Sequence, residues 1–476
     1  MSLFWHRVIG RFLLLAVIGL GMVSTRAAIF STIVTNGPAT NRVNLVFFSE
    51  GYTNGQLSTF LNDVTNAAND LLTTEPYAEY TNYFNVFAIF TNSANAGSTH
   101  LGQGMTYVKG YTYFNSTYDS NSDYIITIPP NLSDGVNSDG QGKISALLTT
   151  YLPVTTNDLP ILLVNDLTPG GSADGGADDY GKLAISSLSQ VSYILVHESG
   201  HTLGKLGDEY TTAYPNYPTN DVEPNTTVAT NFSQIKWNAW IDSSPPIPTP
   251  FTGDYADTVG LFEGAHYHTT GWYRPYENCI MQSHSGSFCP VCQEALVLAI
   301  YGKARPLDSR SPATNNLTVT SAQLLNFSLN LLQPTTHTLN IQWRTNNVAV
   351  NGATNPVFSV WPTQLGGGTK KVEADIWDAT DLVRTDTKNV LKQTNLWNLT
   401  VTLPVLGINS LKWLTNGNFT LQVTGSTPDL VSIQMSTNLA QWVAVQTNAL
   451  ISGKLSYTNT GASLYPRRFF RALTPP

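Results

Sequence analysis

The feature that most constrains this chain is the segment 197–210, HESGHTLGKLGDEY, which begins with an HExxH pattern. The residues before it, 191–196, are mostly apolar and favour a buried helix that carries the pattern. Residues four positions apart share one face of a helix, so His197 and His201 can direct two imidazoles at one metal ion. Glu198 cannot easily bind the same ion and is instead placed to take a proton from a water molecule at the metal.

The residues after the pattern indicate a turn. Gly204 stands three residues after His201, where the helix can end, because glycine adopts positive φ at little cost. We expect this turn to bring a following side chain back to the metal as its third ligand. Catalytic zinc sites usually have three protein ligands and a water molecule.

The string HExGHxxGxLxDEY resembles the IgA-peptidase-like M64 family of zinc metallopeptidases, and its first part resembles the metzincin pattern. Other segments resemble the same family: NRVNLVFFSEGYT at 41–53, PYAEYTNYFNVFAIF at 76–90, and the short motifs at 223–225, 236–237 and 240–241. The resemblance extends from about Asn41 to about Ile300. It implies a zinc-dependent peptidase acting on a protein or peptide substrate.

The metzincin pattern places its third ligand at Gly207, which has no side chain. Asp208 lies one residue further on, and Glu209 is the alternative. Adjacent residues of an extended segment point in opposite directions, so only one of the two is expected to face the metal. We therefore predict Zn²⁺ held by His197, His201 and Asp208, with Glu198 as the catalytic base and Glu209 orienting a ligand or a substrate group.

Other residues between positions 210 and 284 are candidates for the same site, and five of the eight histidines fall between 197 and 284. His266 and His268 are candidates for a ligand or a proton donor, with a surface position as the alternative. Side chains that could stabilise an oxyanion, or simply pack, are Tyr210, Tyr267, Tyr273 and Arg274.

Met281 is predicted to be structural. By the metzincin resemblance it is the methionine of a Met-turn, an apolar floor under the histidine ligands; an ordinary core methionine is the alternative. The three cysteines, Cys279, Cys289 and Cys292, indicate a local disulfide, which an exported chain permits. The CPVC spacing could also form a metal knuckle, but zinc usually takes four ligands and there is no second cysteine pair.

The N-terminus predicts export. Arg7 and Arg11 precede the apolar run 12–23, and small residues lead to Ala27, so residues 1–27 are expected to be a signal peptide cleaved after Ala27. An uncleaved membrane anchor is the alternative. The net charge of −8 and the pI near 5.4 argue against a nucleic-acid partner.

Strands at 42–48, 83–90, 124–128, 159–164 and 182–185, with helices at 56–72 and 144–152, predict an α/β metzincin-like catalytic domain over 28–305. Residues 303–316 are typical of a linker. Period-two patterns then predict two all-β domains, an immunoglobulin-like sandwich at 312–404 and a small β-domain at 405–476. Contact with a cell surface or a glycan is possible through these β-domains.

These features favour a secreted zinc endopeptidase. The alternatives are a catalytically inactive adhesion or glycan- or protein-binding protein, and a zinc amidase acting on cell-wall peptides. Both histidines, Glu198 and the acidic pair are present, which favours an enzyme. Asp134, Asp139 and the loop 174–179 are acidic and glycine-rich, but their spacing fits no EF-hand loop, so we expect them to be solvated rather than to bind calcium.

Overall fold

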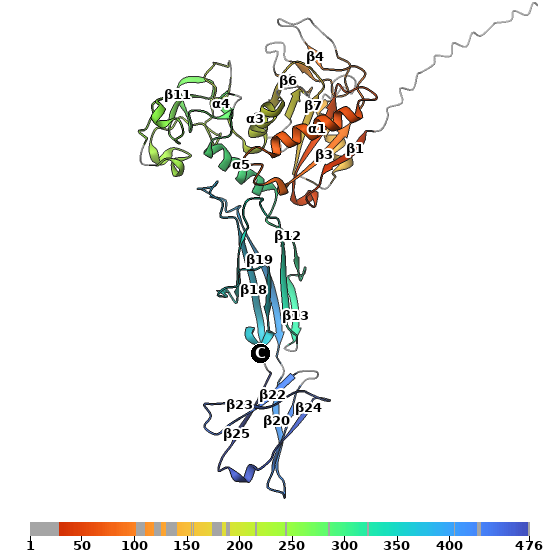
Figure 1. Cartoon of the computed structure of the whole chain (residues 1–476), viewed down its shortest axis with the longest axis vertical. Coiled ribbons are helices and arrows are strands. Elements are labelled where there is room, and N and C mark those ends of the chain that lie inside the picture. The colour runs from red at the N-terminus through yellow and green to blue at the C-terminus, as the bar shows by residue number, and fades with distance from the viewer. Residues whose placement is uncertain are drawn as a thin grey trace, which may run out of the picture.

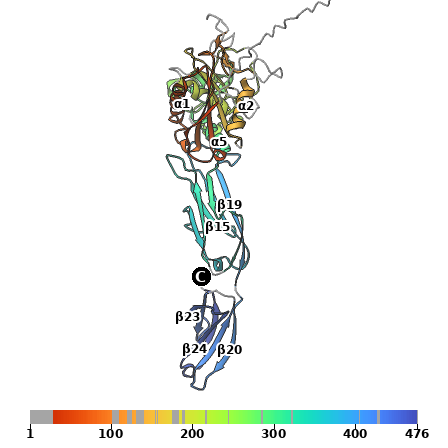
Figure 2. The same cartoon turned by 90° about the vertical axis from the view of Figure 1, so that its right-hand side faces the viewer.

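The computed structural model describes residues 28–474, except 101–109, 119–124, 130–139, 154, 156, 174–182, 187–190, 215–216, 243–244, 284–285, 321–322, 404 and 426–429. The described chain is mostly β-sheet, and it forms three parts that follow one another along a long axis (Figures 1 and 2). The predicted signal peptide, Asp134, Asp139 and the loop 174–179 lie outside the described residues. No helix among the described residues is long and apolar enough to cross a membrane.

The first part is built on a six-stranded sheet with the order β1-β3-β2-β7-β9-β8. The inner strands β2, β3, β7 and β9 run parallel, and β1 and β8 pair antiparallel at the two edges. β2, β3 and β7 are buried along their whole length and are mostly apolar, because both faces of the sheet are covered. The strands span Ile29–Val34 (β1), Val43–Glu50 (β2), Phe84–Phe90 (β3), Asp158–Val164 (β7), Gly171–Ala173 (β8) and Leu183–Ser186 (β9).

Helices cover both faces of this sheet. α1 (Leu57–Leu72), α3 (Val191–Gly204) and α5 (Pro290–Lys303) share a core with one set of strand side chains, which includes Leu45 and Phe47. α2 (Gly140–Tyr151) packs on the opposite set, because successive strand residues point to opposite faces. The motif 197–201 therefore lies on a helix held between the sheet, α1 and α5.

Shorter elements complete the first part. A small sheet joins β4 (Thr99–His100), β5 (Thr117–Tyr118) and β6 (Ile126–Thr127), and a β-ribbon joins β10 (Phe262–Ala265) to β11 (His268–Arg274). The short helix α4 spans Ile280–Ser283. The 3-10 turns of the chain are η1 (Ala39–Asn41), η2 (Thr81–Tyr83), η3 (Phe232–Gln234), η4 (Asn238–Trp240), η5 (Gly253–Tyr255) and, in the last part, η6 (Ala462–Leu464).

The second part is a sandwich of two sheets that share one core. Phe327 from the smaller sheet packs against Trp343 and Trp397 from the larger one. The smaller sheet has the order β12 (Leu307–Ser311), β14 (Leu325–Leu331), β17 (Val357–Val360). The larger sheet has the order β13 (Asn316–Thr320), β19 (Lys392–Thr402), β18 (Gly368–Trp377), β15 (Asn340–Thr345), β16 (Val348–Ala349), and α6 spans Pro362–Leu365.

The third part, like the second, has two sheets, and here each sheet has three strands. The two sheets share a small core that includes Leu421 and Ile433. One sheet has the order β20 (Gly407–Trp413), β21 (Phe419–Thr424), β24 (Lys454–Asn459), and the other β23 (Val443–Ala449), β22 (Leu430–Ser436), β25 (Phe469–Leu473).

The predicted linker at 303–316 is largely ordered structure. Residues 307–311 form β12, which pairs with β14. The buried Arg42 donates two hydrogen bonds to Asp308, at 2.6 and 2.7 Å, and so connects β12 to the first part. The segment is therefore not a flexible linker despite its Pro and Ser residues. Strand pairing holds it to the second part, and the Arg42–Asp308 ion pair holds it to the first part.

Candidate metal centre

The two motif histidines lie side by side on α3. The Nε2 atoms of His197 and His201 are 3.1 Å apart, and their ring planes are inclined by 82°. Each ring has its other nitrogen against a backbone carbonyl: Nδ1 of His197 is 2.9 Å from the oxygen of Ile280, and Nδ1 of His201 is 2.7 Å from that of Leu206. Because Nδ1 donates to a carbonyl in both rings, Nε2 of each is left as an acceptor, which is the form that binds a metal.

The helix ends differently from the prediction for Gly204. The residue with positive φ is Lys205, at 55°, and not Gly204. The amide of Lys205 donates to the carbonyl of His201, which is the bond of an αL C-cap, and the amide of Leu206 donates to the carbonyl of Gly200. Gly204 serves packing instead, because a Cβ there would lie 3.0 Å from the side chain of Leu296 on α5.

The turn after the helix brings Asp208 back to the histidines, as predicted. Oδ1 of Asp208 lies 3.2 Å from Nε2 of His197 and 3.3 Å from Nε2 of His201. The possible ligand atoms of these three residues all lie within 4.8 Å of one another. The carboxylate of Glu209 is not part of this group and belongs to a second cluster.

Asn225 holds the turn in place. Its side chain accepts a hydrogen bond from the amide of Gly207 at 2.7 Å and donates to the carbonyl of Gly207 at 2.9 Å. A Cβ at Gly207 would lie 2.9 Å from Cγ of Glu223, so the chain passes too close for a larger residue. The sequence predicts no role for Asn225, although the residue lies in the family-like motif at 223–225.

The three side chains fit a metal ion. Oδ1 of Asp208 is buried and accepts no hydrogen bond within the described part of the chain. Burial opposes ionisation of Asp208, but the imidazoles of His201 and His197 hold the pKa of its carboxyl well below its ordinary value. Burial lowers the pKa of His201, but Asp208 raises it to about 9, so without an ion a proton on that ring would have to bridge the group. With both rings neutral, two imidazole nitrogens and a carboxylate oxygen form a usual donor set for catalytic zinc.

Glu198 lies beside this group. Its side chain is buried, and burial raises the pKa of its carboxyl although His197 and His201 act to lower it. A Cβ at Gly171 would lie 3.3 Å from Oε1 of Glu198 and 2.4 Å from Ile194. The glycine therefore allows the edge strand β8 to pass close over α3 at the position of Glu198.

A cavity of about 1190 Å³ opens over these residues. His197, Glu198, His201 and Asp208 line its base, and β8 contributes Gly171, Ser172 and Ala173. Its wall is rich in aromatic residues, namely Tyr193, Tyr210, Tyr214, Tyr217 and Tyr267.

Two tyrosines touch the histidine–aspartate group. The hydroxyl of Tyr267 donates to Oδ2 of Asp208, and the ring of Tyr210 stacks on His197 with 5.9 Å between centroids. The backbone helps as well: the amides of His266 and Tyr267 donate to the carbonyls of Asp208 and Tyr210. Tyr267, a sequence candidate for oxyanion stabilisation or for packing, thus contacts a candidate ligand.

The other candidates lie away from the cavity. None of His266, His268, Tyr273 and Arg274 is among the described residues that line it. His266 is buried, donates to the carbonyl of Pro218 and stacks on Trp272 with 3.8 Å between centroids. Nδ1 of His268 is 2.5 Å from the carbonyl oxygen of His266. Tyr273 packs in the core, and Arg274 donates to the carbonyls of Gly264 and Tyr276.

Met281 is buried on α4, directly under the motif. A Cβ at Gly200 would lie 2.9 Å from its sulfur, so the glycine of HExGH lets the methionine approach α3 between the two histidines. Ile280, whose carbonyl oxygen accepts the hydrogen bond from Nδ1 of His197, is the residue before Met281. The three cysteines nearby are free thiols, so the structure does not contain the predicted local disulfide.

One comparison with known proteins shows the family of this chain. A sequence model of the family described as IgA peptidase M64 matches residues 32–258 and 252–300, more than half of the chain. The chain therefore belongs to the M64 peptidase family, which confirms the resemblance found in its motifs. Peptidases of this family are metallopeptidases, and their substrates are proteins or peptides. None of the curated proteins compared with the chain matches it.

Solved structures give only distant likenesses. Apo β-glucuronidase 3 of Bacteroides uniformis is 9% identical at a TM-score of 0.14, and the match covers 46% of this chain and 29% of that one. The fibronectin(III)-like modules of Clostridium thermocellum CbhA are 7% identical at 0.15, covering 31% and 77%. A chaperone–tip adhesin complex of CFA/I fimbriae is 9% identical at 0.14, covering 35% and 91%.

Proposed function

We propose that the protein is an exported zinc-dependent endopeptidase with a metzincin-like catalytic domain. The observation that carries the proposal is the convergence of His197, His201 and Asp208 beside Glu198 at the base of a cavity. Membership of the M64 family supports the reaction class. An inactive binding protein would have no need to keep all four side chains in one place.

His197, His201 and Asp208 would hold the ion. A zinc ion bound there supplies Lewis acidity, which polarises the scissile carbonyl and acidifies the attacking water. The protein's own contribution begins with orientation. Ile280, Leu206 and Tyr267 fix the three ligands through hydrogen bonds, and fixed ligands require no rearrangement when substrate enters.

Glu198 is the proposed general base. Its carboxylate accepts the proton of the attacking water and then donates it to the leaving amine. Both steps are needed in each turnover, so a pKa between those of an ordinary carboxyl and of water is an advantage. Burial raises the pKa of Glu198 in this direction.

The cavity suits an extended peptide. β8 is the terminal strand of its sheet, and among the described residues no other strand pairs with its outer edge. The backbone of an extended substrate can pair with such an edge, which gives affinity without sequence preference. The tyrosine wall then supplies apolar surface for substrate side chains.

Tyr210 is the proposed donor to the developing oxyanion. It lines the cavity and lies against His197. Burial, with Asp208 and Glu198 nearby, raises the pKa of its hydroxyl, so the group stays protonated and able to donate. Tyr273 and Arg274, two other sequence candidates, are not among the described residues that line the cavity.

The β-sheet parts beyond residue 305 carry no comparable cluster among their described residues. We propose that they act outside the cell as immunoglobulin-like and small β-domains that contact a surface or a glycan. Export through residues 1–27 remains the explanation of the N-terminal pattern.

The test is peptide cleavage by the purified protein before and after metal removal. We expect a proteome-derived peptide library to be cut, the cutting to stop after dialysis against 1,10-phenanthroline, and zinc to restore it. Cleavage that continues in protein shown by mass spectrometry to be free of metal would contradict the proposal.

A further inference from the structure

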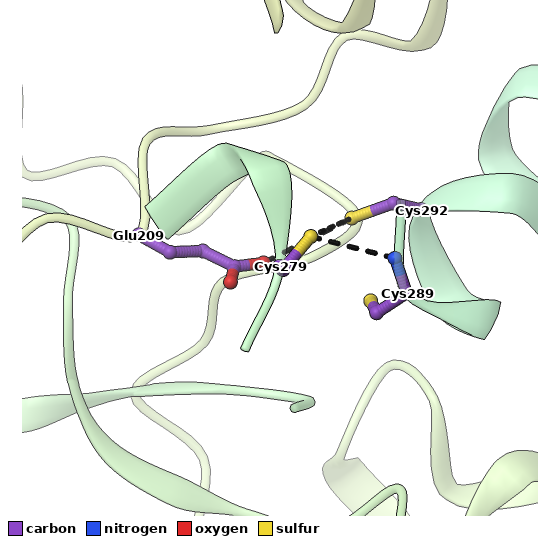
Figure 3. Close-up of side chains that lie close together, drawn as sticks. All are labelled: Glu209, Cys279, Cys289 and Cys292. Carbon is purple, nitrogen blue, oxygen red and sulfur yellow. Dashed lines mark hydrogen bonds between the residues drawn. The ribbon is translucent and has the colours of Figure 1, made fainter. Parts of the chain in front are cut away.

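A second cluster of metal-binding side chains lies beside the first (Figure 3). Glu209, Cys279, Cys289 and Cys292 place one carboxylate oxygen and three sulfurs within 4.8 Å of one another. All four residues are buried, and all three cysteines are free thiols. The sequence offers no second cysteine pair for a metal knuckle, but Glu209 supplies a fourth ligand from 70 or more residues away.

The spacing of the sulfurs fits a tetrahedral metal. Sγ of Cys279 and Sγ of Cys292 are 3.8 Å apart, and Sγ of Cys292 is 3.8 Å from Oε1 of Glu209. Zinc–sulfur distances of about 2.3 Å put two sulfurs of a tetrahedron about 3.8 Å apart. A disulfide would bring the same two sulfurs to about 2.05 Å.

Glu209 has an unused acceptor in this buried place. Its Oε1 receives a hydrogen bond from Nδ2 of Asn225 at 2.9 Å. Its Oε2 is buried and has no hydrogen-bond partner within the described part of the chain. Figure 3 shows the carboxylate directed at Cys279. The oxygen near the sulfurs is Oε1. Burying a carboxylate with so few partners is costly, and a cation bound through Oε1 at the centre of the cluster would offset that cost.

The local structure also suits a thiolate at Cys289. Cys289 is the N-cap of α5 and Cys292 lies in its first turn, so the Cys-x-x-Cys spacing of zinc knuckles begins at a helix N-terminus. The partial positive charge of a helix N-terminus favours thiolate over thiol. Cys279 approaches from the segment before α4, and the amide of Cys289 donates to its sulfur at 3.4 Å.

We propose that Cys279, Cys289, Cys292 and Glu209 bind a structural Zn²⁺ ion, separate from the metal held by His197, His201 and Asp208. Binding forms three zinc–sulfur bonds and one zinc–oxygen bond, and the three thiols release their protons to solvent. No electron is transferred. The buried guanidinium of Arg274, which interacts electrostatically with Glu209 and Cys279, offsets part of the remaining negative charge.

Such a site would connect the segments that surround the first centre. It joins the residue after Asp208, the residue before α4 and the first turn of α5. The amide of Glu209 already donates to the carbonyl of Met281 at 2.9 Å. Zinc at this position would therefore fix the backbone that carries Asp208, so the second ion acts as a positioning element for the first site.

The direct test counts metals and thiols in the full-length protein, purified without reductant. We expect two zinc ions per chain by inductively coupled plasma mass spectrometry, and three thiols that react with Ellman's reagent after denaturation in chelator. One zinc ion with one thiol would indicate a disulfide and overturn the proposal. Three thiols with no zinc ion left in the His197→Ala/His201→Ala variant would overturn it too, by indicating a plain thiol cluster.

Variants separate the two sites without any assay of activity. The double variant His197→Ala/His201→Ala should keep one zinc ion, and with Co²⁺ in its place should keep the near-ultraviolet absorption of thiolate–cobalt bonds. Cys289→Ser/Cys292→Ser should lose that absorption. Since loss of the thiols could also prevent folding, Glu209→Gln is the matched variant: it keeps the thiols and the Asn225 contact.

We expect Glu209→Gln to release the second ion to a chelator at least about tenfold faster than the wild type, a loss no smaller than that caused by removing an outer-shell partner. Release at the wild-type rate would remove Glu209 from the ligand set. The outcome does not depend on the peptidase proposal, because none of these readouts uses a substrate.

Discussion

Asp208 and Glu209 are consecutive residues whose carboxylates belong to two different clusters. Oδ1 of Asp208 lies 3.2 Å from Nε2 of His197, whereas Oε1 of Glu209 lies 3.8 Å from Sγ of Cys292. Asn225 explains the arrangement, because it bonds the backbone of Gly207 on one side and the side chain of Glu209 on the other. The two side chains therefore point into two different clusters, as expected for neighbours in an extended segment.

The first prediction concerns the third ligand. Asp208→Asn should lower retention of the metal at the histidine pair by at least about tenfold, because it removes the negative charge from the donor set while keeping the shape. Competition with a chromophoric chelator measures the loss. Asp254→Asn, the same change at an exposed position, is the control and should leave retention unchanged. Equal retention in both variants would exclude Asp208 as a ligand.

The second prediction concerns the hydroxyl that orients this ligand. Tyr267→Phe removes the donor to Oδ2 of Asp208 and should lower metal affinity or kcat by roughly 10–100-fold. Tyr214→Phe is the matched control, because Tyr214 lines the same cavity without a hydrogen bond to Asp208. If both variants behave alike, the contact of Tyr267 contributes nothing beyond the aromatic wall.

Local patterns are sufficient to predict the helix that carries the motif and four candidate site residues on it and just after it. The pattern of 197–208 fixes His197, Glu198, His201 and Asp208 because they lie within one helix and one turn. The strand predicted at 42–48 and the helix predicted at 56–72 likewise agree with β2 and α1, since their apolar periodicity is strong.

Contacts between distant segments could not be read in the same way. Asn225, Tyr267 and the cysteines meet the 207–209 turn from 16 to 83 positions away, and nothing local indicates which side chains will meet. The sequence predicts a positive φ at Gly204, but Lys205 adopts it. A glycine that is needed for close packing cannot be distinguished in a sequence from a glycine that is needed for a turn. The segment 303–316 has the Pro and Ser content of a linker, and the five residues that form β12 are too few to show the alternation of apolar and polar residues typical of a strand.

The third prediction concerns the ion pair at the junction of the first two parts. Asp308→Asn leaves the buried Arg42 without its counter-charge and should lower the free energy of unfolding by roughly 3 kcal/mol. Asp242→Asn is the control, since its ion pair with Arg384 is 3.6 Å long and exposed, and its effect should stay within about 0.5 kcal/mol. Unfolding midpoints in guanidinium chloride provide the comparison.

The fourth prediction is the pH dependence of this difference. Burial opposes ionisation of Asp308, but Arg42 and Asn41 lower the pKa of its carboxyl below the ordinary value. A lowered pKa in the folded state means stability that is present above the unfolded pKa of about 3.9 and is lost as the pH falls through the folded pKa. The gap between wild type and Asp308→Asn should be full near pH 6 and should shrink below about pH 4. A gap that widens in acid would contradict the assignment.

The most direct test of the proposed function is the turnover of Glu198→Gln on a peptide that the wild type cleaves, measured together with its metal content. Glu198 lies at the cavity but outside the group of His197, His201 and Asp208. We expect metal content equal to wild type and kcat lower by roughly 10²–10⁴-fold, the usual contribution of a general base. Glu263→Gln, an exposed glutamate, should cleave normally. Turnover of Glu198→Gln close to that of the wild type would contradict the mechanism.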